Sequence, residues 1–225
     1  MAEEQQPALR PHPDEPQTRP RDSQPEAPAN EPRRGVLIAA SRLLGYPDDA
    51  SRALLPEIEA YLRGLSDATA TRLAAVTKRL REAGAVEVEA RYVATFEFSE
   101  STALYLTAHE LGDSRNRGQA LVELRAMLRE AGFLEATEEL PDYLPLLLEF
   151  LANAPEDTQV DALERRLAAV CERISTHLDP GSPYRDVFAA VLEVLPEAAE
   201  PNPERRFPQR EKADTGEMPY PLGYD

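Results

Sequence analysis

The sequence predicts an all-α protein: a single helical-bundle domain of about nine short helices, with disordered Pro-rich N- and C-terminal tails. Apolar residues recur at helical spacing through the middle of the chain, and glycines, prolines and capping residues interrupt them at short intervals. We expect a disordered tail at 1–31, the helical domain at 32–195 and a Pro-rich acidic tail at 196–225. The two ends contain too few large apolar side chains to offset the entropy cost of ordering.

The chain is strongly acidic, with a formal net charge of −16. Residues 1–34 carry −2 and residues 196–225 carry −3, which leaves −11 for residues 35–195. A body of this charge repels nucleic-acid phosphates and anionic lipids and attracts basic partners. We therefore expect no nucleic-acid binding.

Cysteine and histidine are too few and too scattered for a metal centre. Cys171 is the only cysteine, and the three histidines show no metal-ligand spacing, so we expect no metal site. The apolar run 36–44 follows two arginines, but it is short, is broken by Arg42 and lies behind a long polar leader. No stretch approaches the roughly 20 apolar residues of a membrane span. We expect no membrane insertion and a cytoplasmic location.

The first half of the domain divides into four predicted helical stretches. The first runs from about 32 to 44 and is stopped by Gly45 and Pro47. The second spans 48–64 with an interruption at Pro56, and the third spans 68–83. Residues 85–97 fit both strand alternation and one helical face. With no partner strand in sight, a helix is favoured there.

In the second half of the domain, the sequence predicts four more helices, two before and two after a central stretch. Ser99 or Ser101 caps a helix that ends at Gly112, and a polar turn leads into a helix from about 117 to 131. After the central stretch, Asp157 or Thr158 begins a helix that extends to Leu178. Ser182 followed by Pro183 begins the last helix, which runs to Leu195.

The central stretch, residues 138–152, reads EELPDYLPLLLEFLA. Asp142 is a candidate N-cap with Pro145 in the first turn; the alternative has Leu140 as the cap and Pro141 as the first helical residue. The helix that follows is apolar nearly all round, so it is either the central core helix or the floor of a groove that receives a partner.

Two groups of polar residues are candidates for chemistry. The first is Asp113, Arg115 and Arg117, which could pair with a ligand or hold the mouth of a groove. Alternatively, Asp113 caps a helix and the two arginines pair with the acidic body. The second group is acidic: Glu138, Glu139, Asp142 and Glu149. These carboxylates either act as general acids and bases or cap helices and face solvent. The structural interpretation is favoured in both cases, because no histidine, nucleophile or phosphate loop accompanies them. We assign no catalytic residue. His109 is interpreted as a surface or boundary residue, and Cys171 as a small buried hydrophobe.

Five blocks of sequence occur in an order that resembles one family. They are Leu43-Leu-Gly-Tyr-Pro47, Arg91-Tyr-Val-Ala-Thr-Phe-Glu-Phe-Ser99, Leu104-Tyr-Leu-Thr107, Gly112-Asp-Ser-Arg-Asn-Arg-Gly118 and Glu139-Leu-Pro-Asp-Tyr-Leu-Pro-Leu-Leu-Leu-Glu-Phe150. Together they resemble the respiratory nitrate reductase delta subunit, the molybdenum cofactor assembly chaperone (NarJ) family of redox-enzyme maturation chaperones. The blocks hold 37 residues spread over positions 43–150 of the domain and extend into neither tail.

The resemblance implies a non-catalytic, all-helical, cytoplasmic chaperone. Its partner would be the apo catalytic (alpha) subunit of respiratory nitrate reductase, bound through its N-terminal segment. The chaperone would assist molybdenum cofactor insertion and delay membrane docking; it would bind no cofactor stably, because the molybdenum cofactor is the client's. The wider group often has a histidine after the Pro-Asp pair, where this chain has Tyr143.

We predict a client groove with an apolar core and an acidic rim, which suits an amphipathic, basic client segment. The residues assigned to it are Leu104, Tyr105, Asp113, Arg115, Arg117, Glu139, Asp142, Tyr143, Leu144, Leu147, Leu148 and Glu149. Core packing is the alternative role for at least half of the apolar members. Two other functions stay open: a helical hydrolase or nucleotide-dependent enzyme that uses the Asp113/Arg115/Arg117 turn, and a structural adaptor that acts through its tails.

Overall fold

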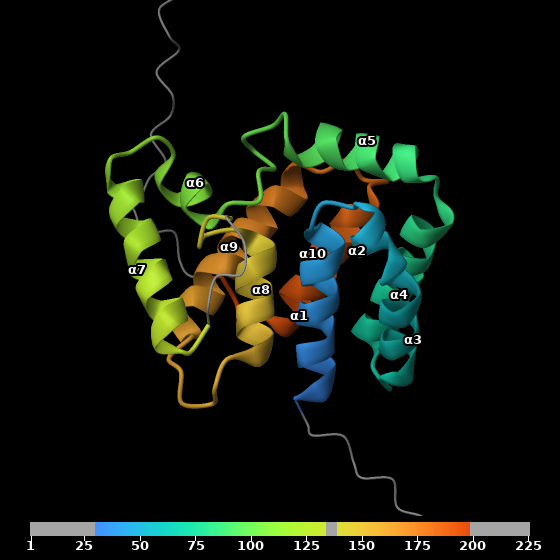
Figure 1. The fold of residues 1–225 in the computed structure, drawn as a ribbon, viewed down its shortest axis with the longest axis horizontal. Coiled ribbons are helices and arrows are strands. Elements are labelled where there is room, and N and C mark those ends of the chain that lie inside the picture. Colours follow the sequence, from blue (N-terminus) through green and yellow to red (C-terminus); the bar gives the residue numbers. More distant parts are fainter. Residues whose placement is uncertain (1–29, 134–138, 199–225) are drawn as a thin grey trace, which may run out of the picture.

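Glycine, proline and capping residues end the helices close to the predicted places. The computed structural model describes residues 30–133 and 139–198, which form ten helices and no strand longer than an isolated bridge (Figure 1). The tenth helix arises because the predicted stretch 48–64 is two helices, with Pro56 in the first turn of the second. The helices are α1 (Glu31–Leu44), α2 (Asp49–Ala53), α3 (Leu55–Gly64), α4 (Ala68–Glu82), α5 (Ala85–Phe96), α6 (Leu106–Leu111), α7 (Asn116–Glu130), α8 (Leu144–Asn153), α9 (Asp161–His177) and α10 (Pro183–Val194).

The core is built around α1, which packs against α8, α10 and α4. In α8, Leu144, Leu147, Leu148 and Phe150 are fully buried, so the central stretch is a core helix. Glu149 lies on its outer side, where its carboxylate pairs with Arg42 at 2.8 Å. One contiguous apolar cluster therefore joins helices from both ends of the domain.

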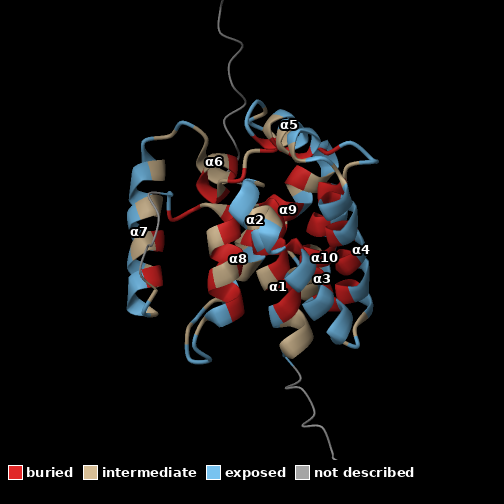
Figure 2. Cartoon of the chain, turned by 45° about the vertical axis from the view of Figure 1, so that its right-hand side comes forward, coloured by how far each residue is buried: buried red, intermediate tan, exposed pale blue. Residues whose placement is uncertain are grey.

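Two helices lie at the edges of this core. Helix α5 crosses one end of the bundle, at the top of Figure 1, and buries only the stripe Val88, Tyr92 and Phe96. The helical interpretation of residues 85–97 is thus confirmed. Helix α7 stands at the side of the bundle, and most of its surface is exposed or half-buried (Figure 2). Its fully buried side chains are Leu124 and Leu128.

The structure corrects several predictions. Helix α6 begins at Leu106 and not after Ser99 or Ser101, because the preceding residues pair with another segment. Helix α9 begins at Asp161, three or four residues later than predicted. His109 is buried and not at the surface. Its ring Nε2 lies 2.7 Å from the carbonyl oxygen of Ala103, so the buried ring has a hydrogen-bond partner.

Other predictions agree with the structure. Cys171 is fully buried, as predicted for a small hydrophobe. Most of the two predicted tails and Glu138 lie outside the described residues. Within the described ranges, no helix has the length and apolarity needed to cross a membrane.

Candidate functional site

Two of the segments singled out in the sequence lie side by side. The amide of Leu106 donates to the carbonyl of Asp142 at 2.9 Å, and the amide of Leu144 donates to the carbonyl of Leu104 at 2.9 Å. Tyr105 and Tyr143 thereby form an isolated antiparallel bridge. This bridge places the starts of α6 and α8 next to each other, although 37 residues separate the two tyrosines.

Asp142 is the buried centre of this junction. Its side chain is fully buried, and its Oδ2 accepts a hydrogen bond from the amide of Thr107 at 3.1 Å and another from the Thr107 hydroxyl at 2.5 Å. The first-turn amides of a helix have no partner within it, so this carboxylate caps α6. The predicted role of Asp142 as the cap of α8 is therefore wrong. Tyr143 occupies the cap position of α8, and Pro145 follows within its first turn.

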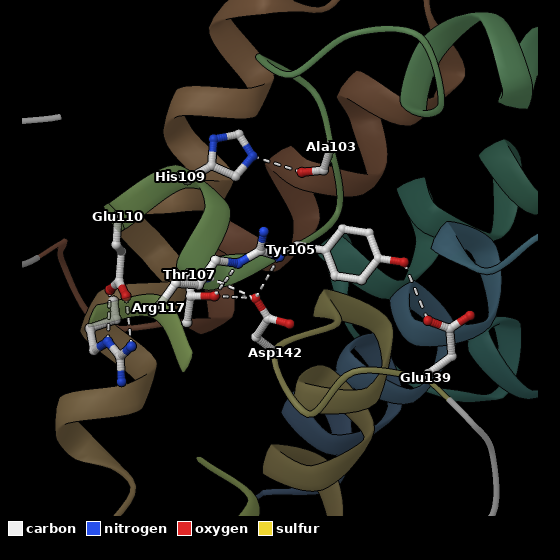
Figure 3. A network of polar contacts seen from close by, with 9 residues as sticks. Ala103, Tyr105, Thr107, His109, Glu110, Arg117, Glu139 and Asp142 are labelled. Carbon is white, nitrogen blue, oxygen red and sulfur yellow. Dashed lines mark hydrogen bonds and ion pairs between the residues drawn. The ribbon is translucent and has the colours of Figure 1, made fainter. Parts of the chain in front are cut away.

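Arg117 completes the junction from the first turn of α7 (Figure 3). Its Nε donates to the Thr107 hydroxyl at 3.1 Å, and its Nη2 lies 3.8 Å from Asp142 Oδ2. Asp113 and Arg115 are exposed, and Asp113 does not cap α7. The structure thus brings one member of the predicted polar turn to Asp142 and leaves the other two at the surface.

The bridge tyrosines belong to an aromatic cluster. The rings of Tyr105 and Tyr143 are 5.5 Å apart, and the Tyr143 hydroxyl lies 3.3 Å from the Tyr92 hydroxyl of α5. Tyr92 in turn donates to the carbonyl of Leu44 at 3.1 Å and packs edge-on against Tyr46. Burial raises the pKa of both Tyr92 and Tyr143, so both hydroxyls stay protonated at neutral pH.

Acidic side chains line the open side of this cluster. Tyr105 donates to Glu139 at 3.3 Å, and burial together with this carboxylate raises the pKa of Tyr105 to about 12 (Figure 3). Glu97, which is exposed at the end of α5, also raises the pKa of Tyr143 through its charge. The aromatic surface therefore has an acidic border.

Helix α6 is fixed to α9 by a second polar contact. Arg166 makes two hydrogen bonds to Glu110, at 2.7 and 2.6 Å, and both side chains are largely buried. His109, one residue earlier, has its pKa lowered chiefly by burial, so it is neutral at physiological pH. Sequence reasoning missed Thr107, Tyr92, Glu110 and Arg166 as site residues. Of these four residues, only Thr107 and Tyr92 could have been found from the sequence, since both lie in blocks that resemble the family.

The predicted groove leucines lie behind this surface and not on it. Leu104 is nearly fully buried, and Leu144, Leu147 and Leu148 have no exposed area. In the segments next to this junction, the exposed large apolar side chains are those of Tyr46, Phe98 and Leu140, which are 47%, 83% and 38% exposed. Tyr46 packs on Tyr92, the carbonyl of Leu140 accepts from the amide of Tyr143 at 3.1 Å, and Phe98 directly follows α5 in sequence. We group these three with the half-buried Tyr105 and Tyr143 under the name tyrosine surface.

Among the described residues, no group of three or more His, Cys, Asp or Glu side chains is placed to hold a metal ion. The carboxylate at the centre, Asp142, caps α6 through Oδ2, and its buried Oδ1 makes no hydrogen bond to the described residues.

The comparisons with known proteins identify the family. The sequence pattern of the family described as "Nitrate reductase delta subunit" matches residues 49–190. The chain is 33% identical over 174 residues to the "Probable nitrate reductase molybdenum cofactor assembly chaperone NarJ" of Bacillus subtilis. The aligned region covers 72% of this chain and 89% of that protein. The chain belongs to the nitrate reductase delta subunit family.

Two further comparisons agree with this membership. The "Nitrate reductase molybdenum cofactor assembly chaperone NarJ" of Escherichia coli K12 is 33% identical over 162 residues, covering 70% of this chain and 68% of that protein. A crystal structure of a "putative redox enzyme maturation protein" from Archaeoglobus fulgidus aligns with a TM-score of 0.53 at 21% identity, over 71% of this chain and 91% of that one, and shows the same fold. The delta subunit family is one of cofactor assembly chaperones, so the chain is not an enzyme.

Proposed function

We propose that this protein is an assembly chaperone for a respiratory nitrate reductase. It binds the N-terminal segment of the apo catalytic subunit, assists molybdenum cofactor insertion and delays membrane docking until the cofactor is in place. The cofactor belongs to the client, and this chain acts in the cytoplasm without holding a cofactor stably. Family membership supports the assembly role, because curated relatives are named as molybdenum cofactor assembly chaperones.

The observation that carries the binding site is the tyrosine surface above the Tyr105–Tyr143 bridge. Exposed aromatic side chains on a rigid base are favourable anchors for a peptide, because they bury large areas at low entropy cost. The rigid base comes from the bridge and from Asp142, which fix both segments. Glu97 and Glu139 at the border favour basic residues on the client segment.

The predicted groove residues divide into two roles under this proposal. Tyr105, Tyr143 and Glu139 contact the client directly. Leu104, Leu144, Leu147 and Leu148 support the surface from below, since direct contact with the client would require their packing to open. Asp142 and Arg117 hold the junction together, and Asp113, Arg115 and Glu149 lie further out on the acidic body.

The decisive experiment is calorimetric titration with an N-terminal peptide of the cognate catalytic subunit, against a scrambled peptide. We expect saturable binding of the native peptide alone. Phe98→Ala and Tyr46→Ala should each weaken binding, whereas Val122→Ala on α7, also an exposed apolar site, should not. Binding that survives the double change Phe98→Ala and Tyr46→Ala in a folded protein would contradict the assignment of this surface.

Charge reversal tests the acidic border separately. Glu97→Lys with Glu139→Lys should weaken peptide binding and reduce its dependence on salt, because the attraction to basic client residues is removed. Glu156→Lys, on the exposed turn before α9, is the matched control. Asp142 is unsuitable for this test, because reversing a buried cap would disturb the fold.

The adaptor alternative is tested by deletion. Removal of residues 1–29 and 199–225 should leave peptide binding unchanged if the tyrosine surface is the site. The deletion must stop there, because Glu31 accepts a hydrogen bond from Tyr61 at 2.7 Å and Ala198 packs against the core. Loss of binding in the folded, shortened protein would favour the adaptor.

A further inference from the structure

A small pocket opens between α1, α2 and α5, at the Leu43–Pro47 block. Its inner space is about 20 Å³, room for roughly one water-sized group. The walls are mostly apolar, and three polar residues, Arg42, Ser51 and Arg52, also line it. The apolar and backbone part of the lining is Leu43, Gly45, Pro47, Leu55, Leu80, Val88 and Tyr184.

Arg52 has a buried donor with no partner. Its Nη2 donates to the carbonyl of Ala83 at 3.1 Å, which fixes the guanidinium at the C-terminal end of α4. Its Nη1 is buried and makes no hydrogen bond. Arginine stays charged at all ordinary pH values, and a buried charged donor left unsatisfied is costly. The position is therefore poised to accept a group with a negatively charged oxygen.

The neighbouring acids do not fill this role. The body carries a large negative charge, yet Arg52 has no ion-pair partner among the residues that the structure describes. Asp48 accepts a hydrogen bond from the amide of Ser51 at 2.7 Å, as the cap of α2. Glu149 is engaged by Arg42 at 2.8 Å.

We propose that this pocket is a binding site for a single carboxylate group, with Arg52 Nη1 as the principal donor. Nη1 donates a charged hydrogen bond to one carboxylate oxygen, and the apolar walls strengthen this bond by excluding water. The inner space of about 20 Å³ admits that one oxygen, and the rest of the group lies at the mouth of the pocket. The carboxylate is supplied by a small acid or by an acidic side chain of a protein segment.

The test is an NMR titration of the arginine side chains of the full-length protein at constant ionic strength. The probes are N-acetylglutamate amide, the otherwise identical N-acetylglutamine amide, and inorganic phosphate. We expect a saturable shift of the Arg52 resonance with the glutamate compound only. A longer acidic peptide that binds more tightly than the free amino-acid derivative would identify a protein segment as the source, and equal affinities would identify a small acid.

Variants separate this site from general charge effects. Arg52→Gln should abolish the saturable response of the neighbouring backbone amides, whereas Arg165→Gln, exposed on α9, should leave it unchanged. Equal responses to the glutamate and glutamine compounds, a stronger response to phosphate, or full binding in Arg52→Gln would each overturn the proposal. The comparison of the two amides uses the unaltered protein, so it stands even if Arg52→Gln fails to fold.

Discussion

The carboxylate of Asp142 accepts hydrogen bonds from both the amide and the hydroxyl of Thr107, 35 residues earlier in the chain. One buried side chain therefore caps α6 from outside that helix, while its own backbone continues into α8. Arg117 binds the same threonine from α7. Three helices thus meet at a single carboxylate.

We expect Asp142→Ala to lower the free energy of unfolding by about 3 kcal/mol, because it removes a buried charged acceptor and leaves the amide of Thr107 unsatisfied. Urea denaturation monitored by circular dichroism measures this. Asp113→Ala, at an exposed position on the same side of the fold, should change stability by less than about 0.5 kcal/mol. Similar effects for the two substitutions would show that Asp142 is not a structural cap.

The Glu110–Arg166 and Arg42–Glu149 pairs differ in burial and in the number of hydrogen bonds, two for the first and one for the second. Glu110 and Arg166 are 12% and 27% exposed, and Arg42 and Glu149 are 47% and 41% exposed. Double-mutant cycles to alanine should give a coupling of about 2 kcal/mol for the first pair and at most about 0.5 kcal/mol for the second. Salt should weaken only the exposed pair strongly. Equal couplings would mean that burial does not govern these contacts.

Alkaline pH should destabilise the protein through Tyr105. Its folded-state pKa is about 12, against about 10 when unfolded, so the folded state retains a proton that the unfolded state loses. This contribution to stability is fully present below pH 10 and is lost as the pH rises towards 12. Chemical denaturation at pH 9, 10 and 11 should show stability falling less steeply in Tyr105→Phe. An unchanged pH slope in this variant would contradict the prediction.

Cys171 should be unreactive in the folded protein. It is fully buried and burial raises its pKa to about 12, so it presents almost no thiolate at neutral pH. A disulfide reagent should modify Cys171 quickly in guanidinium chloride. In buffer, the reaction should be only as fast as the unfolding that exposes the thiol. Destabilising the fold with Asp142→Ala should accelerate the reaction. Rapid, complete modification of the native protein would contradict this burial.

The helices could be predicted from the sequence because their ends are local signals. Asp67 caps α4, and Ser182 with Pro183 begins α10. Pro56 divides the predicted stretch 48–64 into two helices. Each of these residues acts on its neighbours in the chain. The role of Asp142 could not be predicted in the same way. A carboxylate before a proline-containing helix has the pattern of a local cap, and nothing in the spacing reveals that Thr107 will lie beside it.

The candidate site was predictable only in part. The sequence indicated that Tyr105, Asp142 and Tyr143 matter, and the structure places them at one junction. It did not distinguish the buried Leu147 and Leu148 from surface residues, because a run of leucines has the same pattern in a core as in a groove. Exposure at Tyr46 and Phe98 depends on how α5 crosses the bundle, which no local pattern specifies.

The position of α1 between α8 and α10 bears on how the protein is made. Helix α1 ends at residue 44 and α10 begins at residue 183, so the two are separated by 138 residues of chain. Contacts this distant in sequence slow folding, because a long loop must close before they are formed. During synthesis the part of α1 that packs against α10 therefore stays uncovered until the last helix emerges. A chaperone of this design is itself exposed to misfolding and aggregation until its own translation is nearly complete.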